Sequence, residues 1–262
     1  MISCNLQGGL GNQMFQIAAT HALALRNNTG SCFDFGSCHT PMQGNTSTKY
    51  QNNVFSKFNN VSRSVNIHNF QSMYIEPRFG YNEIKFQNQM VLNGYFQSEK
   101  YFKDYKKEII EMFNIPNETL VEDYLIAFKQ MNRPITTVHV RRGDYLNNSE
   151  FHPACSIEYY KKAMDKIGDS SFIFVSDDMA WVQENFKGPN IWYSMFSDEL
   201  SDLKLMTMVD NNIIANSSFS WWGAYLNTNP KKVVIAPKTW FGPKGPQDIE
   251  DIIPPNWSII DF

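Results

Sequence analysis

The sequence contains few cysteines, and those it has form no recognisable metal-binding or disulfide pattern. The chain has 4 cysteines, none of which belongs to a C-x-x-C pair: Cys4, Cys32, Cys38 and Cys155. Zinc and iron–sulfur sites need clustered cysteines, and disulfide frameworks are typical of much shorter secreted chains. We therefore expect free, buried thiols in a protein of a reducing compartment.

Net charge and long apolar runs are also scarce. The formal net charge of the 262-residue chain is −3, whereas binding a nucleic-acid backbone needs a concentrated basic surface, so nucleic acid is not an expected partner. No apolar run approaches the ~18 residues of a membrane span, and no charged-then-apolar leader precedes the first strand-like segment. We expect a cytoplasmic protein without an integral membrane segment, and this prediction leaves peripheral association with a membrane open.

The motifs of several enzyme classes are absent as well. The sequence has no D-x-D triplet, P-loop, G-x-S-x-G or H-E-x-x-H. The first of these absences disfavours a sugar nucleotide held through a metal ion, and the others disfavour P-loop nucleotide hydrolysis, α/β-hydrolase chemistry and zinc proteolysis. We expect no metal ion and no other cofactor.

The second half of the chain shows a regular alternation of strand and helix patterns. Hydrophobic residues make up 42% of the chain and charged residues 19%, which is typical of a globular protein with a core. Strands that alternate with helices form parallel β-α-β units, whose ligands bind beyond the carboxyl ends of the strands. The expected strands are 135–140, 172–175, 190–193, 211–215 and 232–236, and the expected helices are 157–167, 179–186, 200–209 and 220–226.

The first half begins with a strand, a glycine turn and a helix. A strand at 2–6 precedes Gly8-Gly9-Leu10-Gly11, and apolar spacing predicts a helix at 12–26. The turn is not a dinucleotide fingerprint, because Met14 stands where a third small residue is needed. Either it lets a ligand approach the backbone closely or it is a tight turn without a ligand. We place a domain boundary after a further helix, giving an N-terminal domain at 1–131 and a C-terminal domain at 132–262, with the extreme C-terminal segment free to pack back on the first.

The segment His139-Val140-Arg141-Arg142-Gly143-Asp144-Tyr145 lies at the end of a predicted strand, where ligands bind. Strand alternation puts His139 and Arg141 on one side and Arg142 on the other. We expect Asp144 to pair with one arginine, which leaves the other free for a phosphate, whose oxygens suit the planar guanidinium. The alternative is an exposed charged turn.

A second candidate anion site is the turn Asn216-Ser217-Ser218, which joins a short apolar strand to a helix. Free amides at the helix start, together with serine hydroxyls, favour a phosphate. The alternative is an ordinary capped helix, with Trp221 and Trp222 in the core. Two weaker candidates, the segment 176–178 (Ser-Asp-Asp) and Asp202, are equally well explained as helix caps.

Four of these segments together resemble the α-1,2-fucosyltransferases of glycosyltransferase family 11. They are GGLGNQMFQ at 8–16, HVRRGDY at 139–145, SDD at 176–178 and NSSFSWWGA at 216–224, and they occur in the family's order over nearly the whole chain. The resemblance implies an α/β protein of GT-B type, in which two Rossmann-like parallel-sheet domains face a cleft. It also implies metal-independent, inverting transfer of L-fucose from GDP-β-L-fucose to the 2-hydroxyl of a terminal β-galactose in a glycan acceptor.

The resemblance assigns the donor to the C-terminal domain. It implies that Arg141 holds the β-phosphate and that His139 lies near the guanine. Ser218, with the amides of Ser217 and Phe219, would also meet the diphosphate. Asp202 matches an acidic residue that reads the guanine in the wider group of fucosyltransferases.

The acceptor side is less sharply predicted. By resemblance, a loop containing Gly11, Asn12 and Gln13 would face the cleft from the N-terminal domain. The acceptor hydroxyl needs a proton acceptor, and Asp144, Glu150 and His152 all follow the arginine strand without a decision between them. A fucosyltransferase of another linkage or acceptor, such as a protein or a chitooligosaccharide, stays open, as does a non-catalytic sugar- or nucleotide-binding module.

Overall fold

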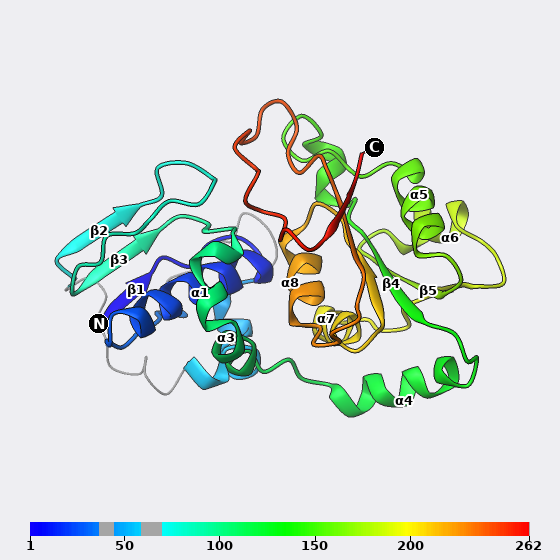
Figure 1. Cartoon of the computed structure of the whole chain (residues 1–262), viewed down its shortest axis with the longest axis horizontal. Coiled ribbons are helices and arrows are strands. Elements are labelled where there is room, and N and C mark those ends of the chain that lie inside the picture. The colour runs from blue at the N-terminus through cyan, green and yellow to red at the C-terminus, as the bar shows by residue number, and fades with distance from the viewer. Residues whose placement is uncertain (37–44, 59–69, 262) are drawn as a thin grey trace. The chain divides into compact units, whose positions relative to one another are not determined.

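Two compact units, each with its own parallel sheet, make up the protein (Figure 1). The computed structural model describes residues 1–36, 45–58 and 70–261. Unit 1 comprises Met1–Asn114 with Asp248–Pro254, and unit 2 comprises Ile115–Gln247 with Pro255–Phe262. The three cysteines that fall in the described residues are free and buried, as expected, whereas Cys38 lies outside them.

The units divide between Asn114 and Ile115, earlier in the chain than the boundary expected after residue 131. The difference is helix α4 (Glu118–Lys129), whose buried face packs in the core of unit 2 against Ile173 of the central sheet. An amphipathic helix between two domains has an apolar face that either core can bury, so its sequence does not reveal which one does. Near the C-terminus, the segment Asp248–Pro254 belongs to unit 1, whereas the following residues return to unit 2.

Unit 1 is built on a sheet of three parallel strands in the order β1-β3-β2. Gly8, with a φ of +74°, turns the chain from β1 into α1, and a Cβ there would lie 2.4 Å from the Asn12 side chain, so glycine is required. The strands are β1 (Ile2–Cys4), β2 (Ser72–Ile75) and β3 (Met90–Asn93). The helices are α1 (Leu10–Arg26), α3 (Lys106–Met112) and the 3₁₀ turns η1 (Ser47–Lys49), η3 (Glu99–Tyr101) and η4 (Lys103–Tyr105).

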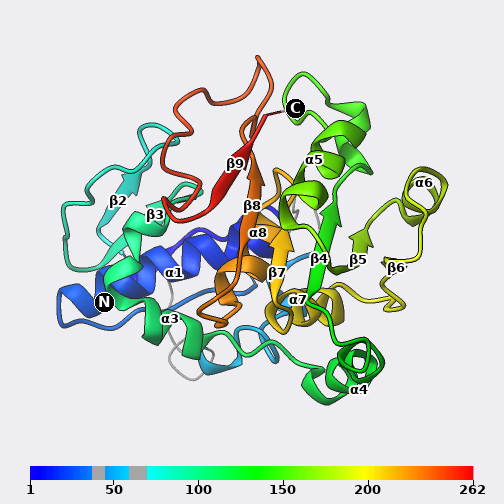
Figure 2. The same ribbon diagram turned by 45° about the vertical axis from the view of Figure 1, so that its right-hand side comes forward.

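Unit 2 is built on six parallel strands in the order β6-β5-β4-β7-β8-β9 (Figure 2). Counted from β4 as the first, this is the order 3-2-1-4-5-6 of nucleotide-binding Rossmann sheets, in which ligands bind where the order reverses. That point lies between β4 and β7. The strands are β4 (Ile135–Val140), β5 (Ser171–Ser176), β6 (Ile191–Tyr193), β7 (Asn211–Ile213), β8 (Val234–Pro237) and β9 (Ser258–Ile260).

Helices cover both faces of this sheet because its strands alternate apolar residues toward both sides. Val138 and Val140 belong to a cluster with the helix α5 (Ile157–Ile167) and with α6 (Met179–Asn185). Ile135 belongs to a second cluster with α4 and with α7 (Glu199–Thr207), against which α8 (Ser218–Leu226) packs. The structure thus confirms the predicted α/β class, with one parallel sheet in each unit, as in proteins of GT-B type.

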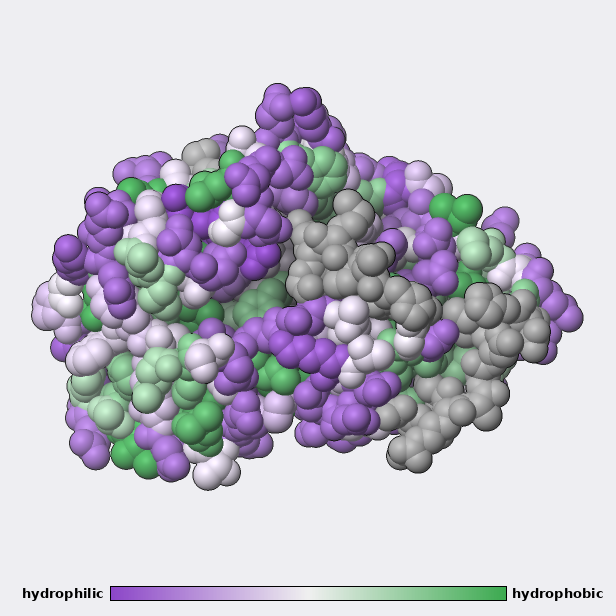
Figure 3. Space-filling model, turned by 180° about the vertical axis from the view of Figure 1, so that it is seen from behind, coloured by the Kyte–Doolittle hydropathy of each residue, from purple (hydrophilic) through white to green (hydrophobic). Residues whose placement is uncertain are grey.

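On the face shown in Figure 3, the described hydrophobic residues lie in small groups among hydrophilic ones. No helix in the described part of the chain combines the length and the apolarity needed to cross a membrane.

Candidate active site

Arg141 directly follows β4 and is held by two carboxylates. Its Nη2 lies 2.6 Å from Asp144 Oδ1, and its Nη1 lies 3.1 Å from Asp177 Oδ2. The side chain is still 29% exposed, and a guanidinium has five N–H donors, so donors remain for a ligand. The two carboxylates therefore orient a cation that stays accessible.

Arg142 is also paired, so the expectation that one of the two arginines would be free of a carboxylate is wrong. Its Nε lies 3.1 Å from Asp178 Oδ2, and its guanidinium lies 3.9 Å from the ring centroid of Trp181. This combination of an ion pair and a cation–π contact leaves Arg142 only 17% exposed. Arg142 thus ties β4 to α6, and Arg141 is the arginine that a ligand can reach.

Asp177 belongs to the segment 176–178, which the sequence alone explained equally well as a ligand-binding motif or as a helix cap. Besides pairing with Arg141, its Oδ1 accepts a hydrogen bond of 2.9 Å from the Arg142 amide. A Cβ at position 143 would lie 2.7 Å from its Oδ2, so Gly143 lets the two loops approach. The register Val140↔Ser176 between β4 and β5 brings Asp177 beside the arginines, and a single sequence does not reveal that register.

The serine turn after β7 forms the start of α8, with Ser217 at the N-cap. The Ser217 side chain makes no capping hydrogen bond, and the first amides of a helix have no partner within it. Ser217 is almost buried, whereas Ser218 and Phe219 are half-buried. Trp221 and Trp222, one turn further on, are fully buried, so the aromatic pair belongs to the core.

The arginine loop and the serine turn lie at the same edge of the sheet. Since β4 and β7 are parallel neighbours, Arg141 and Ser217 both follow carboxyl ends at the point where the strand order reverses. A direct bond fixes the two segments to each other, because the Tyr145 hydroxyl donates to the Asn216 carbonyl over 2.9 Å. Asn216 is itself anchored by its side-chain amide, which donates to the carbonyls of Pro153 and Trp240.

His139 lies beneath this edge, on β4. Its ring centroid is 5.6 Å from that of Phe219, and its buried Nδ1 has no hydrogen-bond partner in the described structure. Burial, with a smaller contribution from the Arg141 charge, lowers the pKa of His139 to about 3. The imidazole is therefore neutral at physiological pH.

Asp202, on α7, is a mostly buried carboxylate with a raised pKa. Burial raises the pKa of Asp202 to about 6. The Ser194 hydroxyl donates a hydrogen bond of 2.5 Å to this carboxylate and partly offsets that increase. Helices α7 and α8 pack closely, since a Cβ at Gly223 would lie 2.7 Å from Met206 Cβ. Both helices follow strands of one parallel sheet, so they run in the same direction. Asp202 precedes Met206 by one turn of α7, and Phe219 precedes Gly223 by one turn of α8. Asp202 and Phe219 therefore lie at the same height along the two packed helices.

The three candidates for the proton acceptor have different surroundings. Asp144 is paired with Arg141, and Glu150 is exposed and lies 2.5 Å from Lys244 Nζ. His152 stacks on Tyr145 with ring centroids 4.8 Å apart, and its buried Nδ1 has no partner in the described structure. Burial lowers the pKa of His152 below its usual 6.5, which favours the neutral imidazole. Of the three candidates, His152 alone has no ionic partner among the described residues.

In unit 1, Gly11, Asn12 and Gln13 lie in the first turn of α1 and are buried, and not in a loop as expected. Gln13 Nε2 donates to the Gly8 carbonyl over 2.8 Å, and Asn12 Oδ1 accepts from Gln97 over 2.7 Å. The helix begins earlier than predicted because Gly9, a residue tolerated at the N-cap, starts it.

Glu76 is a half-buried carboxylate that the sequence did not single out. It follows β2 and accepts hydrogen bonds from the amides of Tyr95 and Phe96, at 2.7 and 3.0 Å, in the segment after β3. Burial raises its pKa to about 7. Because β1, β2 and β3 are parallel, Glu76, the Gln97–Asn12 pair and the glycine turn all lie at the carboxyl edge of the unit 1 sheet. The Tyr95 and Phe96 amides are far from residue 76 in sequence, so no local pattern signals this contact.

In the described residues, no group of three or more histidine, cysteine or acidic side chains is arranged to hold a metal ion.

Comparison with known proteins agrees with the four motifs. The model of glycosyl transferase family 11 matches residues 1–261. The chain is 32% identical to the O-antigen biosynthesis glycosyltransferase WbnK of Escherichia coli, over 92% of this chain and 95% of that protein. It is 29% identical to an alpha-1,2-colitosyltransferase of Escherichia coli, over 92% of each. With the galactoside alpha-(1,2)-fucosyltransferase 2 of Sus scrofa it shares 25% identity, over 86% of this chain and 69% of that protein. The chain therefore belongs to glycosyltransferase family 11 and is a glycosyltransferase.

Proposed function

We propose that the protein transfers L-fucose from GDP-β-L-fucose, with inversion, to the 2-hydroxyl of a terminal β-galactose in a glycan. Family membership supports the reaction class, and the fucosyltransferase and colitosyltransferase relatives support the α-1,2 linkage. The observation that carries the proposal is the position of Arg141 and the α8 N-terminus, which lie together where the strand order of unit 2 reverses.

This arrangement suits a leaving diphosphate. When the fucosyl–phosphate bond breaks, negative charge grows on GDP and positive charge on the sugar ring. Arg141, the amide of Phe219 and the Ser218 hydroxyl are fixed donors, so they stabilise that charge most in the transition state. The Ser217 amide, which was expected to join them, donates instead to the Ala215 carbonyl over 2.8 Å. Asp144 and Asp177 hold the guanidinium in place before the donor binds.

The guanine would lie between Asp202 and Phe219, with the neutral His139 ring beneath. An ionised Asp202 accepts hydrogen bonds from the N1–H and the 2-amino group of guanine, which adenine does not offer in that arrangement. The packing of α7 on α8 supports this assignment, because it puts Asp202 level with the residue that follows the diphosphate-binding serine. We propose Gly11, Asn12 and Gln13, at the start of α1, for the acceptor side.

We also propose that the reaction needs no metal ion. The carboxylates nearest the diphosphate site, Asp144 and Asp177, are both engaged by Arg141. A guanidinium and a helix N-terminus supply the positive charge that a divalent cation would otherwise bring. Activity is then expected to persist in excess EDTA.

A second candidate is transfer of colitose, a sugar that lacks the 3-hydroxyl of fucose. The 29% identity to an alpha-1,2-colitosyltransferase over 92% of both chains supports colitose as an alternative donor sugar. The donor assignments for GDP above are the same in both cases, so the two candidates differ only in what contacts the sugar ring.

A donor panel tests the proposal. The protein is incubated with GDP-fucose, GDP-colitose or GDP-mannose, a β-galactoside and EDTA, and release of GDP is measured. We expect GDP-fucose to be used best and slow GDP release without an acceptor. Preference for GDP-colitose would replace the first candidate by the second, and failure to turn over or bind any of the three would refute both.

A further inference from the structure

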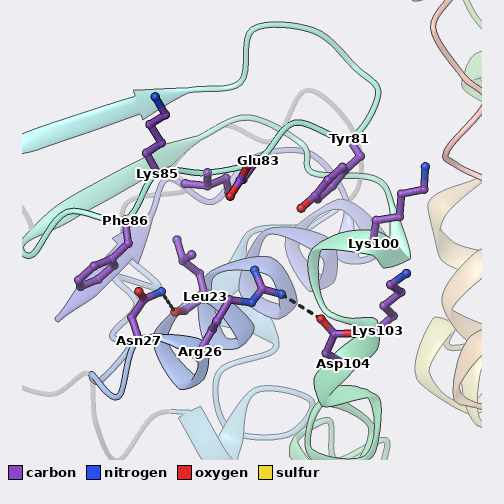
Figure 4. A pocket seen from close by; sticks show the side chains of 11 residues that line it. Leu23, Arg26, Asn27, Tyr81, Glu83, Lys85, Phe86, Lys100, Lys103 and Asp104 are labelled. Atoms are coloured by element: carbon purple, nitrogen blue, oxygen red, sulfur yellow. Dashed lines mark hydrogen bonds and ion pairs between the residues drawn. The ribbon is translucent and has the colours of Figure 1, made fainter.

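The pocket of about 460 Å³ in unit 1 offers an anion little free positive charge (Figure 4). The ammonium groups of Lys85, Lys100 and Lys103 point away from its middle, and Arg26, which points toward it, lies 3.5 Å from Asp104. The described residues of this pocket thus provide no pre-formed anion site. Unit 2 differs, because donors of positive charge gather at the carboxyl edge of its sheet, and a further residue contacts them there.

Tyr145, the last residue of the motif that contains the two arginines, contacts the arginine side of the proposed diphosphate site. It lies in the 3₁₀ turn η5 (Asp144–Asn147), directly after the Asp144 that pairs with Arg141. The Arg141 guanidinium lies over the Tyr145 ring, 5.5 Å from the ring centroid. This distance is within the range of cation–π attraction, so the ring helps the carboxylates to orient the guanidinium.

The hydroxyl of Tyr145 contacts the other side of the same site. It donates to the carbonyl of Asn216 over 2.9 Å, and Asn216 directly precedes Ser217, the N-cap of α8. Burial raises the pKa of Tyr145 well above its usual 10, so the hydroxyl keeps its proton and stays a donor. One side chain therefore connects the arginine with the start of α8.

The Tyr145 ring is itself held in place. It is 6% exposed and stacks on His152, with ring centroids 4.8 Å apart and an angle of 15° between the planes. The loop that carries His152 is bound to the segment after β8, because the Gly242 amide donates to the Phe151 carbonyl over 2.9 Å. A packed ring of this kind resists displacement. Movement of Arg141 relative to α8 would have to displace it.

We propose that Tyr145 is a positioning residue, which holds Arg141 and the start of α8 at the separation that a nucleoside diphosphate needs. The proposal rests on the function proposed above. Donors to a departing phosphate act through their fixed placement, and Tyr145 acts through those donors without touching the ligand. A tyrosine that served only the core would stabilise the fold without favouring a diphosphate over a monophosphate.

Isothermal titration with GDP and GMP tests this role without any need for turnover, because GMP lacks the β-phosphate. At pH 8 the terminal phosphates of both nucleotides are ionised. We expect the wild type to bind GDP at least about tenfold more tightly than GMP. Tyr145→Phe keeps the ring and removes the hydroxyl. It should bind GMP with unchanged affinity and GDP about fivefold more weakly.

Tyr159 offers a matched control variant. Its buried hydroxyl donates to the carbonyl of Ile214 over 2.6 Å, two residues before Asn216. Tyr159→Phe leaves intact the backbone hydrogen bond from the Ile214 amide to the Ile235 carbonyl, so the residues after β7 stay in place. Both variants should lower the midpoint of thermal unfolding by about 2–4 °C. We expect Tyr145→Phe alone to lose part of the preference for GDP.

The outcomes separate the positioning role from the reaction. Equal affinity of the wild type for GDP and GMP, an undiminished preference in Tyr145→Phe, or the same loss in both variants would overturn the proposal. If Tyr145→Phe loses part of the preference but the wild type turns over no GDP-sugar, the proposed function fails while the positioning role stands. If the wild type transfers fucose and Tyr145→Phe matches it in rate and in preference, the positioning role fails while the function stands.

Discussion

The raised pKa of Asp202 predicts how donor binding depends on pH. The free protein holds this carboxyl with a pKa of about 6 because it is buried on α7. Only the ionised form of Asp202 accepts hydrogen bonds from both guanine donors. GDP binding and protonation of this carboxylate therefore compete. Ionised and neutral forms stand at about 10:1 at pH 7 and about 1:10 at pH 5, and GDP affinity should therefore fall about tenfold, or about 1.4 kcal/mol, over that interval.

Isothermal titration of GDP between pH 5 and pH 8 measures this effect, with Asp202→Asn as the control. The terminal phosphate of GDP titrates in the same range and affects both proteins equally, so the ratio of the two affinities isolates Asp202. His139 does not interfere, because its pKa of about 3 keeps it neutral throughout. We expect the variant to bind more weakly at pH 8 and the two affinities to converge near pH 5. A ratio that stays constant over the range would refute the guanine assignment.

Three further predictions concern phosphate binding, stability and the proton acceptor. Arg141→Ala should lower kcat by about 10²–10³ with an unchanged circular dichroism spectrum, and a loss under tenfold would remove Arg141 from the diphosphate site. The pKa of Glu76 rises from 4.5 to about 7 on folding, so the contribution of this carboxyl to the free energy of unfolding should be greatest below pH 4.5 and decline by up to about 3 kcal/mol as the pH rises through 7. The free energy of unfolding, measured with urea at a series of pH values, should therefore fall more steeply with pH in the wild type than in Glu76→Gln. An equal pH dependence in the two proteins would contradict the raised pKa. Among Asp144→Asn, Glu150→Gln and His152→Ala, we expect His152→Ala alone to abolish the acidic limb of the kcat–pH profile. If another variant does so, that residue is the base.

The regular elements of unit 2 could be predicted from the sequence because their signals are local. Strand β4 (Ile135–Val140) and helix α5 (Ile157–Ile167) occur at the predicted bounds, the first as an unbroken buried run and the second as an amphipathic helix capped by Ser156. Strands β2 and β9 were not predicted, since neither is an unbroken buried run: β2 alternates half-buried and exposed residues, and β9 has only three residues.

The candidate site was predictable in its residues but not in its contacts. The arginine loop and the serine turn stand out as motifs, and the strand order of unit 2 brings them to one edge. The second carboxylate on Arg141 is that of Asp177, in the loop after β5. The unit that buries α4 is decided by which apolar surface is available to this helix. Both depend on how strands and helices associate over long sequence distances, which no local pattern contains.

The central claim is most directly tested by the structure of the product. The protein is incubated with GDP-fucose and a terminal β-galactoside, and the glycosidic linkage is determined by nuclear magnetic resonance, with Arg141→Ala as the negative control. We predict a single α-L-fucosyl group on the 2-hydroxyl of galactose, formed by the variant about 10²–10³ times more slowly than by the wild-type protein. A product linked at another hydroxyl, a β-linked product, or equal product from Arg141→Ala would contradict the proposed reaction.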